Sequence, residues 1–234
     1  KQKQLPLPEK DLRFLRMVAR RTWRYFSDFV SDNTSWLPPD NYQVSPQNQL
    51  AMRTSPTNIG LWMLSALAAH DFGYMTVDQV LEKLAHTMKT IGKLERYEGH
   101  LLNWYDVQTL TPLEPRYVSS VDSGNLLGAL WSLEHGLDKL IQRPVLNGKA
   151  FEGLQDTGEI LKQVIEQEGI SGLDARGNDA LMGVWETPPA RIADAIRLLR
   201  RVESSVMALA DAAHESADVE AGAAYWTRQM EGQV

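Results

Sequence analysis

The 234-residue sequence contains no cysteine, which excludes disulfide bonds, thiolate metal sites and thiol nucleophiles. No apolar run approaches the roughly 20 residues that cross a bilayer, and residues 1–10 lack the apolar segment of a signal peptide. Positive charge is also scarce: the formal net charge is -6, so we expect no nucleic acid partner and no membrane insertion by this segment.

Several motifs of known chemistry are missing as well. The five histidines lack the spacing of metal ligands, so we expect no metal, and nothing in the sequence indicates a cofactor. The sequence has no G-x-S-x-G elbow, no P-loop and no dinucleotide fingerprint between a strand and a helix, which sets aside triad hydrolases, kinases and Rossmann enzymes. A neutral or small-molecule ligand is the better expectation.

What the sequence does contain is a globular composition with a strong helical pattern. Hydrophobic residues make up 43% of the chain, enough for a sizeable core. The chain opens with Lys1 rather than Met, so we expect that it was cut from a longer polypeptide. Apolar positions three and four residues apart predict about seven helices and an all-α fold of antiparallel helical hairpins. The predicted helices cover residues 8–30, 55–73, 76–94, a segment around 126–137, 151–168, 188–213 and 216–230.

Local signals mark several helix ends. Ser55 is expected to cap the second helix, with Pro56 as its first residue and Gly73 at its end. Thr76 and Gln79 predict a capping box for the third helix, and the fourth is expected to be capped by Asp122 or Ser123. Thr187 and Pro188 are expected to open the long helix after the glycine-rich segment 169–183.

Two long connections, 31–54 and 99–119, separate these helices, the second with irregular or short paired strands. Aromatic rings flanked by carboxylates, amides and guanidinium groups match sugars, which present apolar ring faces edged with hydroxyls. The structural alternative is that the aromatics plug the loops onto the core and the acids cap helices. The candidate substrate-binding residues are Trp36, Asp40, Asn41, Arg53, Asn103, Trp104, Tyr105, Asp106, Tyr117, Asp122, Ser123 and Asn125.

Several strings resemble those of cyclic β-1,2-glucan synthases. They are Trp-Leu-Pro-Pro-Asp-Asn at 36–41, Arg-Thr-Ser-Pro-Thr-Asn-Ile-Gly-Leu at 53–61, Asp-Phe-Gly-Tyr at 71–74, Gly-His at 99–100, Asn-Trp-Tyr-Asp at 103–106 and Tyr-Val-Ser-Ser-Val-Asp-Ser-Gly-Asn-Leu at 117–126. The resemblance extends over about 20–136. It implies the first half of the central, glucoamylase-like region of a large bacterial inner-membrane protein, on its cytoplasmic side.

The resemblance also implies a fold and an activity. It predicts a partial (α/α)6 toroid with long decorated loops, in which residues 1–145 form the N-terminal part of a glucan-binding domain and 146–234 a helical continuation. The implied partners are β-1,2-glucan and the remaining regions of the parent synthase, and the implied reaction is ring closure by transglycosylation. We expect half a toroid to dimerise through exposed helix faces or to repack its last helices.

The catalytic carboxylates are not assigned, because no glutamate of this chain matches a catalytic one. Asp106 and Asp122 are candidates for binding sugar hydroxyls or positioning a partner, and the chain alone is expected to be inactive. Two alternatives stay open: a noncatalytic carbohydrate-binding or spacer module, and an endo-acting β-1,2-glucan hydrolase.

Overall fold

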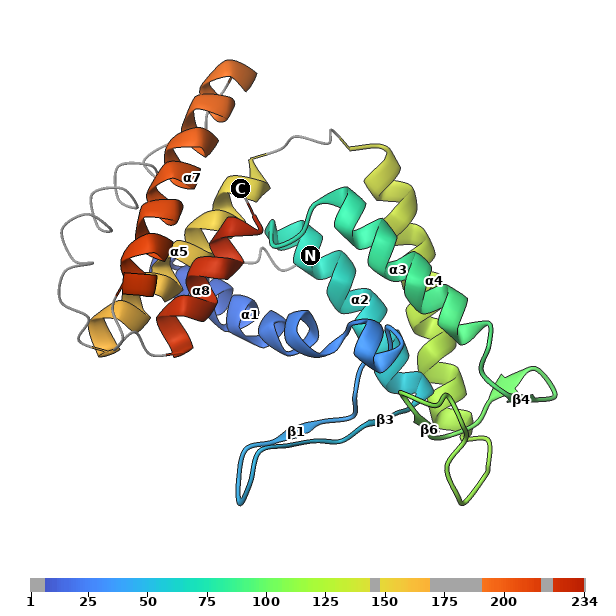
Figure 1. Ribbon diagram of the computed structural model, residues 1–234. Helices are drawn as coiled ribbons and strands as arrows, with labels where there is room; N and C mark the ends of the chain where they lie inside the picture. Colours follow the sequence, from blue (N-terminus) through green and yellow to red (C-terminus); the bar gives the residue numbers. More distant parts are fainter. Residues whose placement is uncertain (1–6, 144–147, 169–190, 216–220, 234) are drawn as a thin grey trace. The chain divides into compact units, whose positions relative to one another are not determined.

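The computed structural model describes residues 7–143, 148–168, 191–215 and 221–233. These ranges form seven α-helices and three two-stranded antiparallel sheets, which confirms the mainly helical prediction (Figure 1). The chain divides into two compact units. The first contains Lys1–Arg20, Phe72–Tyr74 and Leu146–Val234, and the second contains Arg21–Asp71 and Met75–Val145. Helix α1 (Glu9–Phe29) contributes residues to both units.

The helices of the second unit begin largely where the local signals place them. Helix α2 (Pro56–Phe72) starts directly after Ser55, whose hydroxyl accepts a hydrogen bond from the amide of Asn58. Helix α3 (Val77–Ile91) has the predicted capping box of Thr76 and Gln79. Helix α4 (Ser120–Ile141) corrects the sequence prediction, because its cap is Ser119 rather than Asp122 or Ser123. Asp122 is instead in the first turn, where its amide donates to the Ser119 hydroxyl.

Close contacts fix the directions of these three helices. A Cβ at Gly60 of α2 would lie 2.8 Å from the Cβ of Ala129 of α4. Likewise, a Cβ at Gly136 of α4 would collide with the side chain of Leu67 of α2. The two contacts advance together along the chain, so α2 and α4 run parallel. Helix α3 returns between them in sequence, as the predicted hairpin requires, and the indole Nε1–H of Trp62 donates to Thr87 at 2.9 Å.

Short strands gather at the end of this unit where α2 and α4 begin (Figure 1). The first long connection holds a 3-10 turn, η1 (Asp32–Thr34), and a hairpin of β1 (Tyr42–Gln43) with β2 (Gln49–Leu50). A hairpin of β4 (Arg96–Tyr97) with β5 (His100–Leu101) starts just before the predicted bounds of the second connection and leads into it. Strand β3 (Arg53–Thr54) of the first connection pairs with β6 (Tyr105–Asp106) of the second. The prediction of short paired strands in the second connection is confirmed.

The first unit has its own apolar core. Helix α8 (Ala221–Glu231) packs against both α5 (Lys149–Glu168) and α7 (Ile192–Glu215). Three predicted helices are therefore confirmed over their described parts, whereas the predicted entry at Thr187 and Pro188 and the glycine-rich 169–183 lie outside the described residues. The buried apolar side chains are Leu154, Ile160, Leu161, Ile165, Leu198, Val202, Ala223, Trp226 and Met230.

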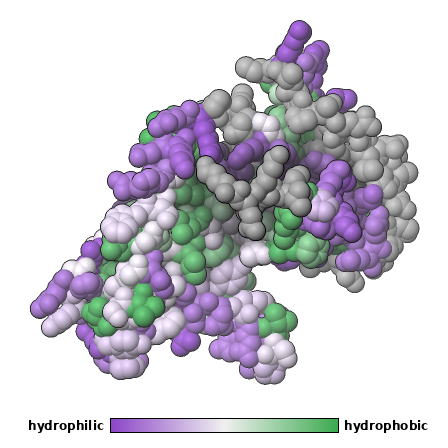
Figure 2. Space-filling view, turned by 180° about the vertical axis from the view of Figure 1, so that it is seen from behind, coloured by the Kyte–Doolittle hydropathy of each residue, from purple (hydrophilic) through white to green (hydrophobic). Residues whose placement is uncertain are grey.

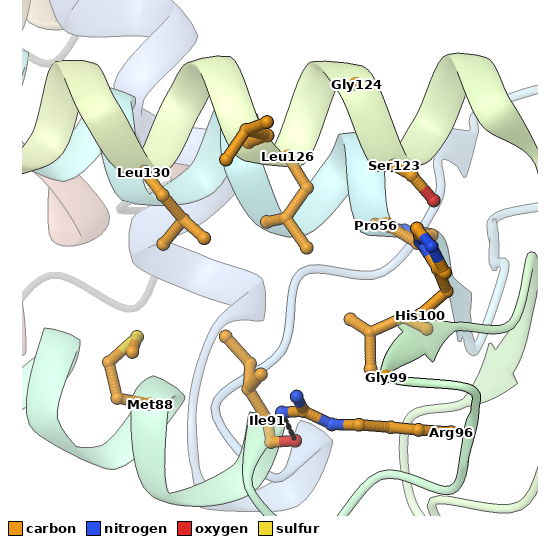
Figure 3. A pocket seen from close by; sticks show the side chains of 12 residues that line it. Pro56, Met88, Ile91, Arg96, Gly99, His100, Ser123, Gly124, Leu126 and Leu130 are labelled. Carbon is orange, nitrogen blue, oxygen red and sulfur yellow. Dashed lines mark hydrogen bonds between the residues drawn. The ribbon is translucent and has the colours of Figure 1, made fainter.

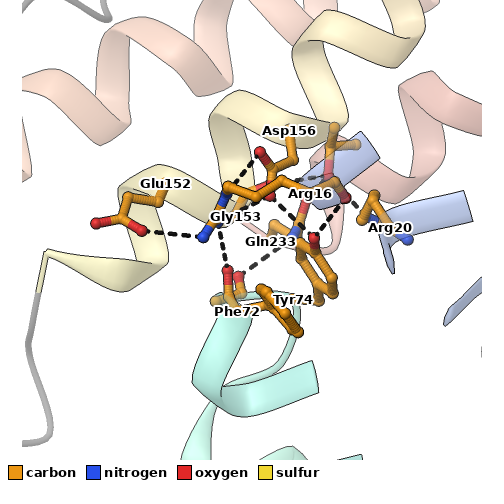
Figure 4. A network of polar contacts seen from close by, with 10 residues as sticks. Arg16, Arg20, Phe72, Tyr74, Glu152, Gly153, Asp156 and Gln233 are labelled. Atoms are coloured by element: carbon orange, nitrogen blue, oxygen red, sulfur yellow. Dashed lines mark hydrogen bonds and ion pairs between the residues drawn. The ribbon is translucent and has the colours of Figure 1, made fainter. Parts of the chain in front are cut away.

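A polar network fastens α1 to α5 within this unit (Figure 4). Arg16 forms an ion pair with Asp156 at 2.8 Å, and the Tyr74 hydroxyl donates to the same carboxylate at 2.9 Å. Burial raises the pKa of Asp156, and the Arg16 guanidinium only partly opposes this effect. Arg20 is 1% exposed and its Nε–H donates to Thr157 at 2.9 Å. Its charge is therefore held by hydrogen bonds and by the rings of Tyr74 and Trp226.

Some apolar side chains remain on the surface. Green apolar areas interrupt the polar surface on the side seen in Figure 2. On α4 the exposed apolar residues include Val121, Leu127 and Ile141, together with Trp131, which is 62% exposed. In the described parts of the chain, none of the helices has the length and apolar character to span a membrane.

Candidate functional site

The pairing of β3 with β6 brings the two long connections together. Arg53 stands opposite Asp106 in this ladder, and Thr54 stands opposite Tyr105. The Arg53 guanidinium consequently lies over the indole ring of Trp104, 4.7 Å from its centroid. Such a cation–π contact stabilises a partly exposed pair by about 0.5–1 kcal/mol. Residues that the sequence places some 50 positions apart therefore meet directly.

Asp40 joins this meeting point from the first connection. Its Oδ2 accepts hydrogen bonds from the Arg53 guanidinium at 3.1 Å and from the Asn41 amide at 3.0 Å. Its Oδ1 accepts from the side-chain amide of Asn58, in the first turn of α2, at 3.1 Å. Burial, and then the negative charge of Asp40, raise the pKa of Tyr25 to about 12, so this phenol stays protonated.

Asp122 lies where the first turns of α2 and α4 meet. Its Oδ1 accepts a hydrogen bond of 2.6 Å from the hydroxyl of Thr57, which also accepts from the Asn125 amide at 3.1 Å. Burial acts to raise the pKa of Asp122, but hydrogen bonds led by those from Ser119 and Thr57 outweigh it and lower the pKa. The positive ends of the two helix dipoles also favour the carboxylate here.

Asn103 links the acid to the aromatic residues. Oriented to satisfy its neighbours, its side-chain amide donates to Asp122 at 3.0 Å, and its carbonyl oxygen accepts from the indole Nε1–H of Trp104 and from the Tyr117 hydroxyl at 2.8 Å. We call the connected set the aromatic–acid cluster. Its members are Asp40, Asn41, Arg53, Thr57, Asn58, Asn103, Trp104, Tyr117, Asp122 and Asn125.

Three predicted site residues have other surroundings. Asp106 closes its own turn, because Oδ1 accepts from the amides of Gln108 and Thr109. Tyr105 is fully buried, and its hydroxyl donates to the Glu95 carbonyl. Trp36 stacks on His86 of α3 with ring centroids 4.6 Å apart, and its carbonyl accepts a hydrogen bond from the Thr87 hydroxyl of the same helix.

A pocket of about 590 Å³ lies between α3, the start of α4 and the β4–β5 hairpin (Figure 3). Its floor is apolar and includes Ile91, Leu126 and Leu130, whereas its polar lining comes from Arg96, His100 and Ser123. Of these lining residues, only Ser123 is among the predicted site residues. The Gly-His string at 99–100 is a sequence signal for His100. The apolar lining residues carry no such signal, because they follow the same spacing as the buried face of any amphipathic helix.

Ser123 and Asp122 show how the cluster and the pocket are related. They are neighbours in the first turn of α4, yet Asp122 bonds with Thr57 and Asn103 whereas Ser123 lines the pocket. The combination of an indole ring, acceptor oxygens and amides beside a cavity suits a hydroxyl-rich ligand with apolar faces.

The chain has a curated relative with a closely related sequence. It is 43% identical over 165 residues, or 70% of its length, to the cyclic beta-(1,2)-glucan synthase NdvB of Rhizobium meliloti (strain 1021). The match spans 6% of the length of that relative. No family model matches the chain. The identity to NdvB confirms the resemblance seen in the sequence strings.

Proposed function

The chain is homologous to a segment of a cyclic β-1,2-glucan synthase, and from this premise we propose that it forms part of a cleft that holds β-1,2-glucan during transglycosylation and ring closure. The connections 36–53 and 103–125 line a subsite for glucose rings, on a helical framework that is part of an (α/α)6 toroid. Its partners are the glucan and the other regions of the synthase, a bacterial inner-membrane protein with this segment on the cytoplasmic side.

The observation that carries the proposal is the meeting of the two connections in the aromatic–acid cluster. The Arg53 guanidinium on the Trp104 ring joins them, and the parallel α2 and α4 present their first turns beside them. A rigid pair of helices with decorated connections at one end is a common arrangement for a binding site. Without the β3–β6 pairing, the same residues would be scattered over separate loops.

The chemistry of the cluster suits glucose. The indole of Trp104 offers an apolar face to the C–H groups of a pyranose ring. The carboxylate of Asp40 and the amide of Asn125 offer an acceptor and a donor to ring hydroxyls. Because these groups come from three segments of the chain, they approach a bound ring from different sides.

The acids of the cluster favour binding rather than a nucleophilic role. Retaining transglycosylation uses two carboxyl groups about 5–5.5 Å apart, one of which must reach the anomeric carbon. Both oxygens of Asp122 accept hydrogen bonds, as do both oxygens of Asp40. This engagement supports the alternative in which the segment itself is a noncatalytic carbohydrate-binding module of the enzyme.

The test is calorimetric titration of the protein with linear β-1,2-gluco-oligosaccharides. Trp104→Ala removes the stacking face, so affinity should fall by about tenfold or more, equivalent to about 1.4 kcal/mol. Trp131→Ala is the matched control, because that indole is exposed on α4 and outside the cluster. Equal affinities for Trp104→Ala and the parent chain would refute the site, and so would an equal loss in Trp131→Ala.

Product analysis separates the remaining alternatives. In the synthase that carries this segment, the proposed role predicts cyclic products that decline when Trp104 is replaced. An endo-hydrolase would release linear oligosaccharides instead, and a spacer would leave the products unchanged in Trp104→Ala. Either result would contradict a role in ring closure.

A further inference from the structure

Asn103 occupies a buried position between three members of the aromatic–acid cluster. It is 5% exposed, and its backbone amide donates to the carbonyl of Tyr117 at 2.9 Å. Its side-chain carbonyl accepts from Trp104 and Tyr117, and its side-chain nitrogen donates to Asp122. A buried amide in such a place is stable only in the orientation that satisfies both ends.

Asp122 determines that orientation. An ionised carboxylate accepts hydrogen bonds but donates none, so it selects the nitrogen end of the Asn103 amide. The carbonyl end is then directed at the indole Nε1–H of Trp104 and at the Tyr117 hydroxyl. The other carboxylate oxygen is held by Thr57 at 2.6 Å, which prevents Asp122 from turning away.

Arg53 holds the same indole from a different direction. Its guanidinium covers one face of Trp104, 4.7 Å from the centroid, and Asp40 fixes the guanidinium through an ion pair of 3.1 Å. An indole held at its Nε1 edge and on one face can offer only its opposite face to a ligand. The ring is therefore oriented before a ligand arrives, which lowers the entropy lost on binding.

We propose that Asp122 is a positioning residue, which acts through the amide of Asn103 to fix the indole of Trp104 as a preformed platform for a glucose ring. The glucose part of this inference rests on the proposed function. The positioning part does not, because it depends only on contacts among side chains of the protein.

The test uses the indole N–H resonances of the 15N-labelled chain, with Trp104→Phe identifying the Trp104 signal. Asp122→Asn can turn the Asn103 amide, so the Trp104 signal should shift because the indole Nε1–H then loses the Asn103 carbonyl as its acceptor. The sequence contains seven tryptophans, so the other six signals report whether the fold is intact. Asp71→Asn is the charge-matched control, because Asp71 pairs with Arg143 elsewhere in the same unit.

Glucan titration completes the test. Asp122→Asn should weaken β-1,2-glucan binding by about tenfold, as expected for loss of an ordered hydrogen bond beside the ligand. Asp122→Glu should recover part of that loss, since it restores an acceptor. An unmoved Trp104 signal in Asp122→Asn would overturn the positioning role. A shifted signal without glucan binding by the parent chain would uphold the positioning role and refute the proposed function.

Discussion

Two glycines in helices should respond to the same substitution with opposite signs. Gly153 lies in α5 against the turn that ends α2, where Gly73 adopts a φ of 82°. A Cβ at position 153 would be 2.2 Å from the Gly73 carbonyl oxygen, 2.4 Å from its carbon and 2.8 Å from its Cα. Gly128 lies within α4, and a Cβ there would meet nothing within 4 Å. The perturbation is therefore Gly→Ala at each position.

The magnitudes follow from these distances. Alanine stabilises a helix interior by about 1 kcal/mol relative to glycine, and this gain should appear in full in Gly128→Ala. In Gly153→Ala the new methyl group lies about 1.2 Å closer to the Gly73 oxygen than ordinary van der Waals contact, which begins near 3.4 Å. The atoms that it meets belong to the backbone, so they cannot easily move aside. Overpacking costs about 1–3 kcal/mol, and three backbone atoms under 3.0 Å place this case at the upper end of that range, so the net change should be a loss of about 2 kcal/mol.

The assay is urea unfolding followed by circular dichroism, with hydrogen exchange of the α5 amides to localise the change. Hydrogen exchange is needed because two units need not unfold in a single transition. Gly153→Ala should accelerate exchange in α5 and leave α4 unaffected. A Gly153→Ala variant as stable as Gly128→Ala would refute the close approach of α5 to the Gly73 turn.

Three further outcomes are expected. Thr87→Val should lower the free energy of unfolding by about 1–3 kcal/mol, because the buried Nε1–H of Trp62 loses its acceptor. A double-mutant cycle with Trp62→Phe should show coupling between the two positions, and additive effects would contradict this hydrogen bond. The pKa of Asp106 is lowered, since amide and hydroxyl donors of its turn outweigh burial, so its stabilisation is present above the unfolded pKa and lost as pH falls through the folded one. Asp106→Asn should therefore flatten the acid limb of the stability curve below about pH 4 in chemical denaturation, and an unchanged slope would contradict it. If exposed α4 faces drive association, Trp131→Lys should reduce self-association in sedimentation velocity, and an ideal monomer in the parent chain would exclude this interface.

Local chemistry made much of the helical framework predictable. The capping box of Thr76 and Gln79 and the Ser55-Pro56 start depend on neighbouring residues, so the sequence alone contains the signal. The cap of α4 was predicted wrongly because residues 119–123 hold four hydroxyl or carboxyl side chains, each of which suits a helix cap. Ser119 became the cap, while Asp122 is held by Thr57 of another helix, a partner that no local pattern reveals.

The candidate site was predictable in composition but not in geometry. Asn103, Trp104 and Asp122 were selected by residue type, and the structure connects them through one amide. The β3–β6 pairing that adds Arg53 involves only two residues from each strand, too short for a recognisable alternation. Trp36 shared the same residue type yet packs on His86, because an aromatic side chain alone does not specify its partner.

The buried guanidinium of Arg20 makes the completion of its own unit depend on residues that are synthesised late. Its hydrogen-bond partners Thr157 and Gln229 follow it by 137 and 209 positions, whereas the contact between Thr57 and Asn125 spans only 68. A ribosome therefore releases every residue of the aromatic–acid cluster long before Arg20 can be enclosed. Until then its charge remains hydrated, so the unit that contains the aromatic–acid cluster can form before the unit that contains Arg20 is complete.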